Sequence, residues 1–255
     1  MSENPSSGRR AALVTGASYG IGAAVAAGLA EDGFDVAVTD LQTDGLADTI
    51  AAIGKAGGRG VPIALDLRSH GSIEAGFRAA VEAFGQLDVL VNNAGVPSPN
   101  RPVVDITQAE WDLILAVNLT GTFFMSQQMG RHLMGTGRPG AIISLASTHG
   151  IVGFAGGSAY GITKAGVAHM AKMLAIEWAP HGIRVNAIAP GTTETKSRAP
   201  RLADPRHRQR MLSRIPAGRF GTAEEMAAAI RYLASPEASY VTGQTLVLDG
   251  GLTAG

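Results

Sequence analysis

Short apolar segments alternate with longer, alanine-rich segments along almost the whole chain. The short segments are rich in Val, Ile and Leu and have the length of buried strands, whereas the longer ones have the apolar spacing of helices. Strands are predicted at Ala11 to Thr15, Asp35 to Asp40, Val61 to Leu65, Asp88 to Asn92, Ala141 to Leu145, Arg184 to Pro190 and Thr245 to Asp249. The predicted helices include Ile21 to Glu31, Ser72 to Phe84, Gln108 to Met134, Tyr160 to Trp178 and Ala223 to Leu233.

Most of these strands are apolar at successive positions and not only at alternate ones. Because successive side chains of a strand point to opposite faces of a sheet, both faces must be covered. The alternation of strands and helices favours parallel pairing through βαβ units. We therefore expect an α/β fold with a seven-stranded parallel sheet between two helical layers. With 255 residues and no internal repeat or linker, residues 1–255 are expected to form a single domain.

Composition and charge exclude several classes of protein. Hydrophobic residues make up 45% of the chain and charged residues 16%, which excludes intrinsic disorder. The 21 basic and 21 acidic side chains cancel, so no global field favours nucleic acid or a membrane surface. The absence of cysteine excludes disulfides and zinc–thiolate sites. No apolar run is long enough to span a membrane, and the polar first ten residues lack the apolar core of a secretory signal, so we expect a cytoplasmic protein.

A glycine-rich turn, TGASYGIG, follows the first strand and leads directly into a helix. Gly16, Gly20 and Gly22 let the chain turn tightly and let the backbone approach a pyrophosphate, whose charge the helix N-terminus favours. Their spacing is G-x-x-x-G-x-G, which differs from the usual G-x-G-x-x-G fingerprint. The turn alone is compatible with a plain strand-to-helix connection.

Asp40 strengthens the prediction of a dinucleotide site. It ends the second strand, 18 residues beyond Gly22, where a carboxylate can accept hydrogen bonds from the ribose hydroxyls of adenosine. The same charge would repel a 2′-phosphate, and neither Tyr19 nor Leu41 supplies a cation that could receive one. We therefore predict NAD and not NADP as the cofactor. The alternative for Asp40 is a turn or helix-capping residue.

Tyr160 and Lys164 are candidates for proton transfer. A separation of four residues places them on one face of a helix, one turn apart. A phenol has an ordinary pKa near ~10, and a neighbouring ammonium lowers that pKa by favouring the phenolate. Such a pair can act as a general acid and base, although the same spacing is common on solvated helices.

The order of these motifs resembles that of the classical short-chain dehydrogenase/reductase family. The motifs are TGASYGIG, NNAG (residues 92–95), VNLTG (residues 117–121), the separation of Ser147 from Tyr160, Y-x-x-x-K and PGTTET (residues 190–195), and the resemblance runs from about Ala11 to Gly251. It implies a Rossmann-like, single-domain, three-layer sandwich. It also implies hydride transfer between a nicotinamide and a carbonyl or secondary alcohol, with the pro-S hydride moving.

The resemblance implies a role for each of four catalytic residues. Tyr160 matches the acid/base, and Lys164 matches the lysine that lowers the phenol pKa and holds the nicotinamide ribose. Ser147 matches the serine that hydrogen-bonds the substrate oxygen, and Asn118 the asparagine that kinks its helix and anchors a water in the proton relay. In isolation, Ser147 could be a capping hydroxyl after the fifth strand and Asn118 a buried amide satisfied by backbone.

The cofactor is expected to be held by the glycine turn, by residues after several strands and by the catalytic pair. PGTTET is expected to meet the nicotinamide carboxamide, the alternative being a turn after the sixth strand. The predicted cofactor residues are Gly16, Ser18, Tyr19, Gly20, Ile21, Gly22, Asp40, Leu41, Asp66, Leu67, Asn92, Ala94, Gly95, Tyr160, Lys164, Pro190, Gly191, Thr193 and Thr195.

The segment from Lys196 to Phe220 does not fit the alternating pattern. Three prolines interrupt it, and it predicts neither a strand nor a buried helix. Connections of this length in a compact domain are usually functional or mobile, so we expect a substrate lid at about residues 195–220. Seven of the 17 arginines lie between Arg198 and Arg219, with Asp204 as the one acid. The lid could therefore select an anionic substrate, or its arginines could simply face solvent or another subunit.

Two substrate classes remain open. One is a small hydroxylated molecule, namely a sugar, polyol or sugar acid, oxidised with NAD. The other is a 3-oxoacyl thioester on acyl carrier protein, reduced with NADPH and docked near Arg138 and His181, which overall similarity to 3-oxoacyl reductases supports and Asp40 opposes. The predicted substrate residues are Ser147, His149, Phe154, Tyr160 and Arg201.

Two further alternatives concern the chemistry as a whole. A dinucleotide-sensing protein could have kept the fold and lost turnover, against which the intact set of four residues argues. A metal enzyme is not expected, because the six histidines lack paired ligand spacing.

The long helical segments also predict self-association. The segments Gln108 to Met134 and Gly157 to Trp178 are apolar on more than one face and carry methionines that suit either a core or an interface. The methionines are Met125, Met129, Met134, Met170 and Met173. The family resemblance implies that these helices pair across two-fold axes and that the tail TGQTLVLDGG forms a second interface. We therefore expect a homotetramer.

Overall fold

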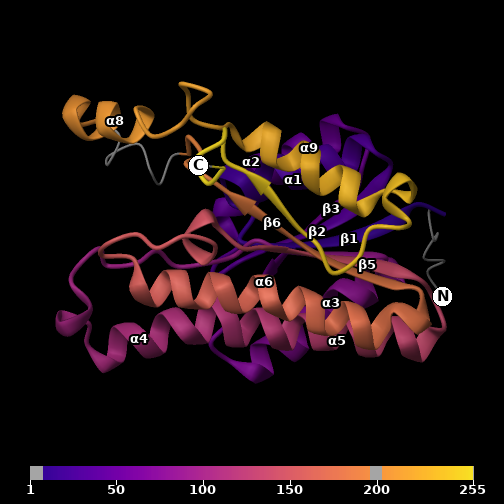
Figure 1. The fold of residues 1–255 in the computed structure, drawn as a ribbon. Coiled ribbons are helices and arrows are strands. Elements are labelled where there is room, and N and C mark those ends of the chain that lie inside the picture. The colour runs from indigo at the N-terminus through magenta and orange to yellow at the C-terminus, as the bar shows by residue number, and fades with distance from the viewer. Residues whose placement is uncertain (1–7, 196–202, 255) are drawn as a thin grey trace.

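A parallel seven-stranded sheet forms the centre of the molecule (Figure 1). The computed structural model describes residues 8–195 and 203–254. The sheet order is β3-β2-β1-β4-β5-β6-β7, and every neighbouring pair is parallel. The strands are β1 Arg10–Thr15, β2 Phe34–Asp40, β3 Gly60–Ala64, β4 Val89–Asn92, β5 Gly140–Leu145, β6 Ile183–Pro190 and β7 Thr245–Leu248. The predicted sheet is confirmed, and no strand end differs from its predicted position by more than one residue.

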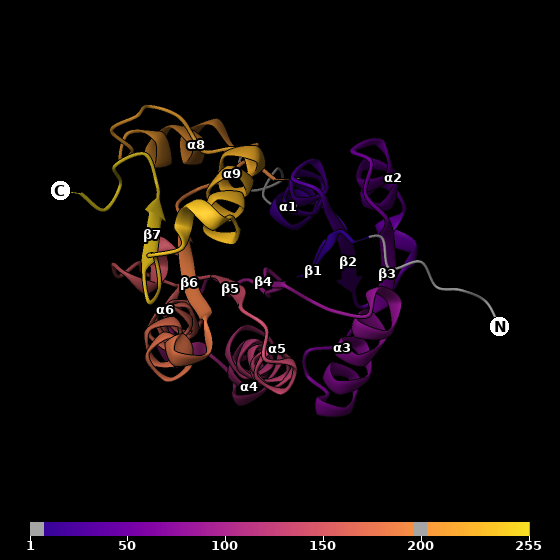
Figure 2. The ribbon, with the colours of Figure 1, turned by 90° about the vertical axis from the view of Figure 1, so that its right-hand side faces the viewer.

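Helices cover both faces of the sheet (Figure 2). One layer holds α1 Gly20–Glu31, α2 Ala47–Lys55 and α9 Ala223–Ala234, and the other holds α3 His70–Phe84, α4 Gln108–Leu115, α5 Thr122–Thr136 and α6 Ser158–Trp178 (Figure 1). Successive strand residues enter different cores: Leu13 packs with the α3–α6 layer and Val14 with the α1–α9 layer. This alternation, with both positions fully buried, explains why the strands are apolar at successive positions.

Two helical features differ from the expected pattern. The predicted helix from Gln108 to Met134 contains a π-helical turn at Ala116–Gly121, between α4 and α5. The second feature is the helix α8 Pro205–Leu212, which lies within the predicted lid and has no buried residue. Asp204 caps it and Pro205 occupies its first turn, so local signals and not an apolar face define it.

The carboxyl ends of the strands gather the predicted site residues. In parallel sheets this edge carries the ligand site, because the loops after neighbouring strands meet there. Thr15, Asp40, Asn92, Leu145 and Pro190 each end one strand. Within residues 8–195 and 203–254, no helix is long and apolar enough to cross a membrane.

Candidate active site

The glycine turn after β1 is packed too closely for side chains. Gly16 has a φ of +65°, and a Cβ there would lie 2.7 Å from the Cα of Ala94. A Cβ at Gly22 would lie 2.4 Å from the carbonyl oxygen of Gly16. The first turn of α1 is therefore drawn against the backbone of the preceding loop, which leaves a bare backbone surface at the helix N-terminus.

Asn93, which sequence reasoning missed, fastens this turn to the loop after β4. Its Nδ2 donates to the carbonyl oxygens of Thr15 at 2.9 Å and of Gly16 at 2.7 Å. In return the Oγ1 of Thr15 accepts from the backbone N–H groups of Asn93 and Ala94. The sequence signal that could have identified Asn93 is the NNAG motif, in which Asn93 is the second asparagine.

Asn92 lies in the interior. It is 4% exposed, and its Nδ2 donates to the Oγ atoms of Ser126 and Ser144 at 2.9 and 3.1 Å. Its side chain therefore ties β4 to α5 and β5, and only its backbone could meet a cofactor. Ala94 and Gly95 follow it at the surface of the site, partly buried and exposed, respectively.

Asp40 stands beside the glycine turn, as predicted. Its Oδ2 accepts from the Oγ of Ser18 at 2.5 Å, and its Oδ1 accepts from the backbone N–H of Leu41 at 2.8 Å. Tyr19 and Leu41 flank it with 49% and 61% of their surfaces exposed. The carboxylate is held in place and still has lone pairs for further donors.

Asp66 and Leu67 are placed differently from one another. The carboxylate of Asp66 is held by the guanidinium of Arg68 at 2.7 to 3.0 Å, and these hydrogen bonds lower the pKa of Asp66. Leu67 is buried against Gly121, where a Cβ would come within 2.7 Å of it. Leu67 is thus part of the wall below the site.

Lys164 lies beneath the ring of Tyr160 on α6. Its Nζ is 5.7 Å from the ring centroid and donates to the carbonyl oxygen of Leu145 at 2.5 Å. Only 4% of Lys164 is exposed, and burial lowers its pKa, with the charge of Tyr160 acting in the opposite direction. An ammonium in such a poorly solvated place can stabilise negative charge that develops on the phenol oxygen during proton transfer.

Asn118 occupies the π turn and is fully buried. Its Oδ1 accepts from the N–H of Val96 at 2.8 Å, and its Nδ2 donates to the carbonyl oxygen of Val96 at 2.9 Å. A Cβ at Gly95 would lie 3.2 Å from this Oδ1 and 3.7 Å from the Nζ of Lys164. The π turn therefore brings an amide, a glycine backbone and the lysine to one place, as such turns often do at functional sites.

Ser147 follows β5 and begins the short helix Thr148–Gly150. Its Oγ accepts from the N–H of His149 at 3.2 Å, so the capping role is present. Among the described residues its O–H has no acceptor, which leaves that hydrogen for a substrate oxygen. Gly150 lets this short helix lie against α6, because a Cβ there would be 2.6 Å from the N atom of Ala165.

Two aromatic side chains extend the wall from Tyr160. The rings of His149 and Phe154 stack at 4.2 Å and 28°, and His149 meets Tyr160 edge to face at 5.6 Å. Both residues were predicted to face substrate. The third residue predicted only for substrate, Arg201, lies outside the described residues.

The loop after β6 closes the other side. Gly191 approaches the backbone of Asp249, and Thr193 is buried and bridged to Gly221. Thr195 lies next to Gly20, where a Cβ would be 3.3 Å from the Cγ2 of Thr195.

Two further predicted cofactor residues lie near this edge of the sheet. The carbonyl oxygen of Pro190 accepts from the Oγ1 of Thr148 at 3.4 Å. Ile21 is partly buried at the start of α1. The PGTTET segment and the glycine turn thus lie on one edge of the sheet.

The comparisons with known proteins agree with this arrangement. The family described as Enoyl-(Acyl carrier protein) reductase matches residues 16–253. A 3beta-hydroxysteroid dehydrogenase of Eggerthella lenta is 41% identical over 247 residues, covering 94% of this chain and 92% of the relative. A cis-4-hydroxycyclohexanecarboxylate dehydrogenase of Sinomonas cyclohexanicum is 42% identical over 245 residues, covering 96% and 97%.

Solved structures show the same likeness. A variant of actinorhodin polyketide ketoreductase with NADPH superposes with a TM-score of 0.90 and 35% identity, covering 96% of this chain and 97% of that chain. The matches to relatives and solved structures extend over nearly the whole chain. They include the glycine turn and the segments that carry Asn118, Ser147, Tyr160 and Lys164. The chain therefore belongs to the classical short-chain dehydrogenase/reductase family of oxidoreductases.

Proposed function

We propose that the protein oxidises a secondary alcohol of a small hydroxylated molecule, namely a sugar, polyol or sugar acid, with NAD. The observation that carries the proposal is the buried Lys164 beneath Tyr160, with Asn118 bound to Val96 beside Gly95, the glycine that borders the lysine. The residues present fit a dinucleotide, because Gly16 and Gly22 lack side chains and pack closely against Ala94 and the Gly16 carbonyl, which leaves a cradle of bare backbone at the N-terminus of α1. A bound nicotinamide supplies the acceptor for the hydride.

The residues act on the alcohol as follows. Ser147 donates its O–H to the substrate oxygen, and Tyr160 takes the hydroxyl proton as the carbinol hydride leaves and a carbonyl forms. Lys164 stabilises the phenolate on which this step depends. Asn118 holds the backbone of Val96 and thereby the loop that borders the site. In the reverse direction, Tyr160 returns the proton.

The first test removes only the proton route. Tyr160→Phe should lower kcat by about 100- to 10,000-fold, since a positioned acid or base contributes a factor of this size. Binding of NADH, followed by its fluorescence, should stay within about twofold because the fold is untouched. Rates would be measured by NADH absorbance with polyols, aldoses, sugar acids and the ring hydroxy acid named by one relative. Turnover that persists in Tyr160→Phe would remove Tyr160 from the mechanism.

The choice of NAD rests on Asp40. Its carboxylate faces the glycine turn. The neighbouring residues Ser18, Tyr19 and Leu41 carry no positive charge that could bind a 2′-phosphate. Because one structural relative carries NADPH, the cofactor needs its own test. Asp40→Ser should reduce the preference for NAD over NADP by about tenfold or more, since it removes the repulsion. An unchanged ratio of kcat/KM values would contradict this assignment.

The thioester alternative is weakened at its proposed docking residues. Arg138 is engaged by Asp88 at 2.8 Å, so its charge is already compensated. Reduction of a 3-oxoacyl thioester with NADPH, but no oxidation of free alcohols with NAD, would nevertheless favour that alternative. Tight NAD binding without any turnover would favour the sensing protein.

We also propose a homotetramer. Met125, Met129 and Met170 belong to the core, whereas Met134 and Met173 are 37% and 49% exposed. Other large apolar side chains are exposed on the same helices and on the edge strand: Leu113, Phe123, Ile162, Ile176, Leu246 and Val247. These surfaces coincide with the helices and tail that the family resemblance assigns to subunit contacts. Light scattering that gives the 26.1 kDa mass of a monomer would reject the tetramer.

A further inference from the structure

The acids in and beside the lid are already used by local contacts. Glu194 pairs with Arg208 at 2.9 Å, and Glu225 is held by Arg219 at 2.5 and 2.9 Å. The grip of Arg219 lowers the pKa of Glu225 to about 2. Asp204 caps α8 by accepting from the N–H of Arg206 at 3.0 Å. These acids therefore leave part of the lid's positive charge uncompensated.

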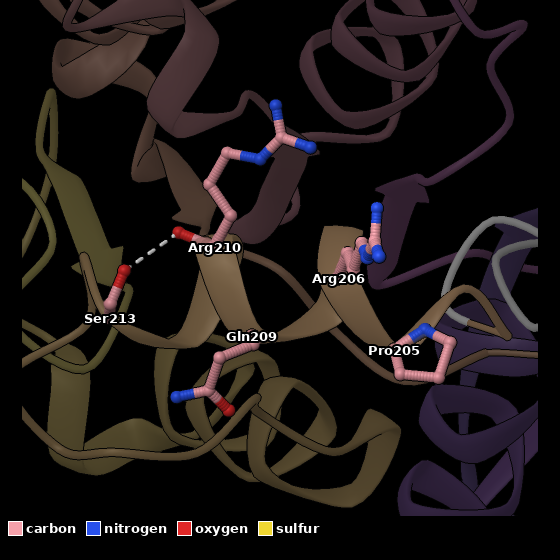
Figure 3. Close-up of a pocket in the computed structure, with 5 residues that line it drawn as sticks. All are labelled: Pro205, Arg206, Gln209, Arg210 and Ser213. Atoms are coloured by element: carbon pink, nitrogen blue, oxygen red, sulfur yellow. Dashed lines mark hydrogen bonds between the residues drawn. The ribbon is translucent and has the colours of Figure 1, made fainter.

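In the described part of the lid, three arginines carry that charge: Arg206, Arg210 and Arg214. Among the described residues none of them pairs with an acid, and the stretch 196–202 contains no acidic residue. Arg206 and Arg210 extend from one side of α8, with Gln209 on the other, around a shallow hollow that Pro205 and Ser213 complete (Figure 3). Among the described residues, neither of these two arginines contacts an aromatic ring.

Arg214 has a different position. Its guanidinium lies 5.2 Å from the ring centroid of Phe154, on the loop between β5 and α6. Phe154 stacks on His149, and His149 meets the ring of Tyr160 edge to face. The guanidinium is thus connected to the catalytic phenol through two aromatic rings, with no contact longer than 5.6 Å. The ring of Phe154 orients the arginine, while its exposed planar fork can bind another group.

We propose that Arg214 binds a carboxylate of the substrate at the end remote from the carbon that is oxidised. This inference rests on the proposed alcohol oxidation at Tyr160. A guanidinium can bind a carboxylate with two parallel hydrogen bonds, and such charge-assisted pairs are roughly twice as strong as neutral ones. Among the described arginines of the lid, Arg214 combines an uncompensated charge with a contact to the aromatic wall of the site.

The position of Arg214 also determines which acids should fit. His149 and Phe154 lie between the guanidinium and Tyr160, so the carboxylate and the reacting hydroxyl must be several bonds apart. A 2-hydroxy acid would place its carboxylate beside Tyr160 and out of reach of Arg214. Among the hydroxylated substrates proposed above, the acids that fit are therefore those whose carboxylate and reacting hydroxyl are at opposite ends of a ring or chain.

The test compares an acid with its neutral counterpart in variants of one residue. The probes are 4-hydroxycyclohexanecarboxylate and its carboxamide, and 5-hydroxyhexanoate and its carboxamide, with NAD. Arg214→Gln should lower kcat/KM for the acids by about 10- to 100-fold, which corresponds to the 1.5–3 kcal/mol of a hydrogen bond to a charged group. Most of this loss should be in KM, with the amides changed less than about twofold. Arg214→Lys should recover part of the loss, because it keeps the charge without the fork.

Arg210→Gln is the matched control, since it removes the same charge from the same segment (Figure 3), at an arginine for which no ring contact is found among the described residues. It should change kcat/KM for each of the four probes by no more than about twofold when all rates are measured at one ionic strength. Equal losses for acid and amide in Arg214→Gln would show a structural role and overturn the proposal, as would an unchanged kcat/KM for the acids. A wild-type protein that oxidises neutral alcohols without preferring the acids would overturn the carboxylate contact alone. A wild-type protein that oxidises no alcohol would overturn the proposed function itself.

Discussion

Gly16 has a φ of +65°, and a Cβ added to it would lie 2.7 Å from the Cα of Ala94. Gly16→Ala should therefore cost the left-handed strain of about 1–2 kcal/mol and, in addition, push the glycine turn away from the loop after β4. Gly57→Ala is the control, because Gly57 has a φ of +81° and no neighbour within 4 Å of an added Cβ. Both variants should lower the free energy of unfolding, but only Gly16→Ala should weaken NADH binding by tenfold or more. Equal binding by the two variants would contradict the cradle.

Residues in short contiguous motifs could be predicted from the sequence, whereas residues defined by a distant contact could not. Tyr160 and Lys164 share one helix face, so their spacing already brings them together. The two asparagines of NNAG look alike in sequence, and only the structure shows that Asn92 points inward and Asn93 holds the glycine turn. In the sequence Arg214 is one of several lid arginines, and only its contact with Phe154 in the structure distinguishes it.

At the scale of elements, the strands could be predicted because burial on both faces leaves a continuous apolar run. The π turn could not be read from the apolar spacing, which continues from α4 through it into α5, and only the family resemblance implied that Asn118 kinks its helix. In the structure Asn118 lies in this turn and binds both backbone groups of Val96. The helix α8 was missed because it has no buried face from which a period could be read.

A histidine on α5 should make the packing of this helix sensitive to acid. The Nε2 of His132 accepts from the backbone N–H of Leu87 at 3.1 Å, and its ring packs edge-on against Phe77. Burial and then the charge of Arg138 lower the pKa of His132, while Asp88 acts in the opposite direction. The folded state therefore binds its proton at lower pH than the unfolded state does.

It follows that the free energy of unfolding should fall as the pH drops below the ordinary histidine pKa of about 6.5, until the lowered pKa of the folded state is reached. His132→Gln should reduce the difference in Tm between pH 8 and pH 5.5, whereas His169→Gln, which removes an exposed histidine of α6, should not. The measurement is thermal unfolding at both pH values. An unchanged difference in His132→Gln would show that other groups dominate the acid response.

At the scale of the whole molecule, the lid is attached to the C-terminal tail and not only to its own two ends. Ile215 and Phe220 form a small core with Met211, Leu212 and Leu252, separate from the two large ones. The N–H of Ala217 donates to the carbonyl oxygen of Gly250 at 3.0 Å (Figure 1 shows the C-terminus near this region). The tail thus follows directly from β7 at the sheet edge and supports the segment that carries Arg214.

This attachment predicts that a tail residue controls substrate affinity. Leu252→Ala removes half-buried apolar surface worth about 1 kcal/mol, and the loss falls on the lid because its core is a separate cluster. KM for the alcohol should rise several-fold while NADH affinity and Tm change little, and trypsin should cleave the lid arginines faster than in the wild type. Ile50→Ala, which truncates a comparable half-buried side chain of α2 in the core beneath α1 and α9, should lower Tm without either effect. If Leu252→Ala left both KM and lid cleavage unchanged, the tail would be a passive end of the sheet, and the position of Arg214 would depend on Phe154 and its own helix alone.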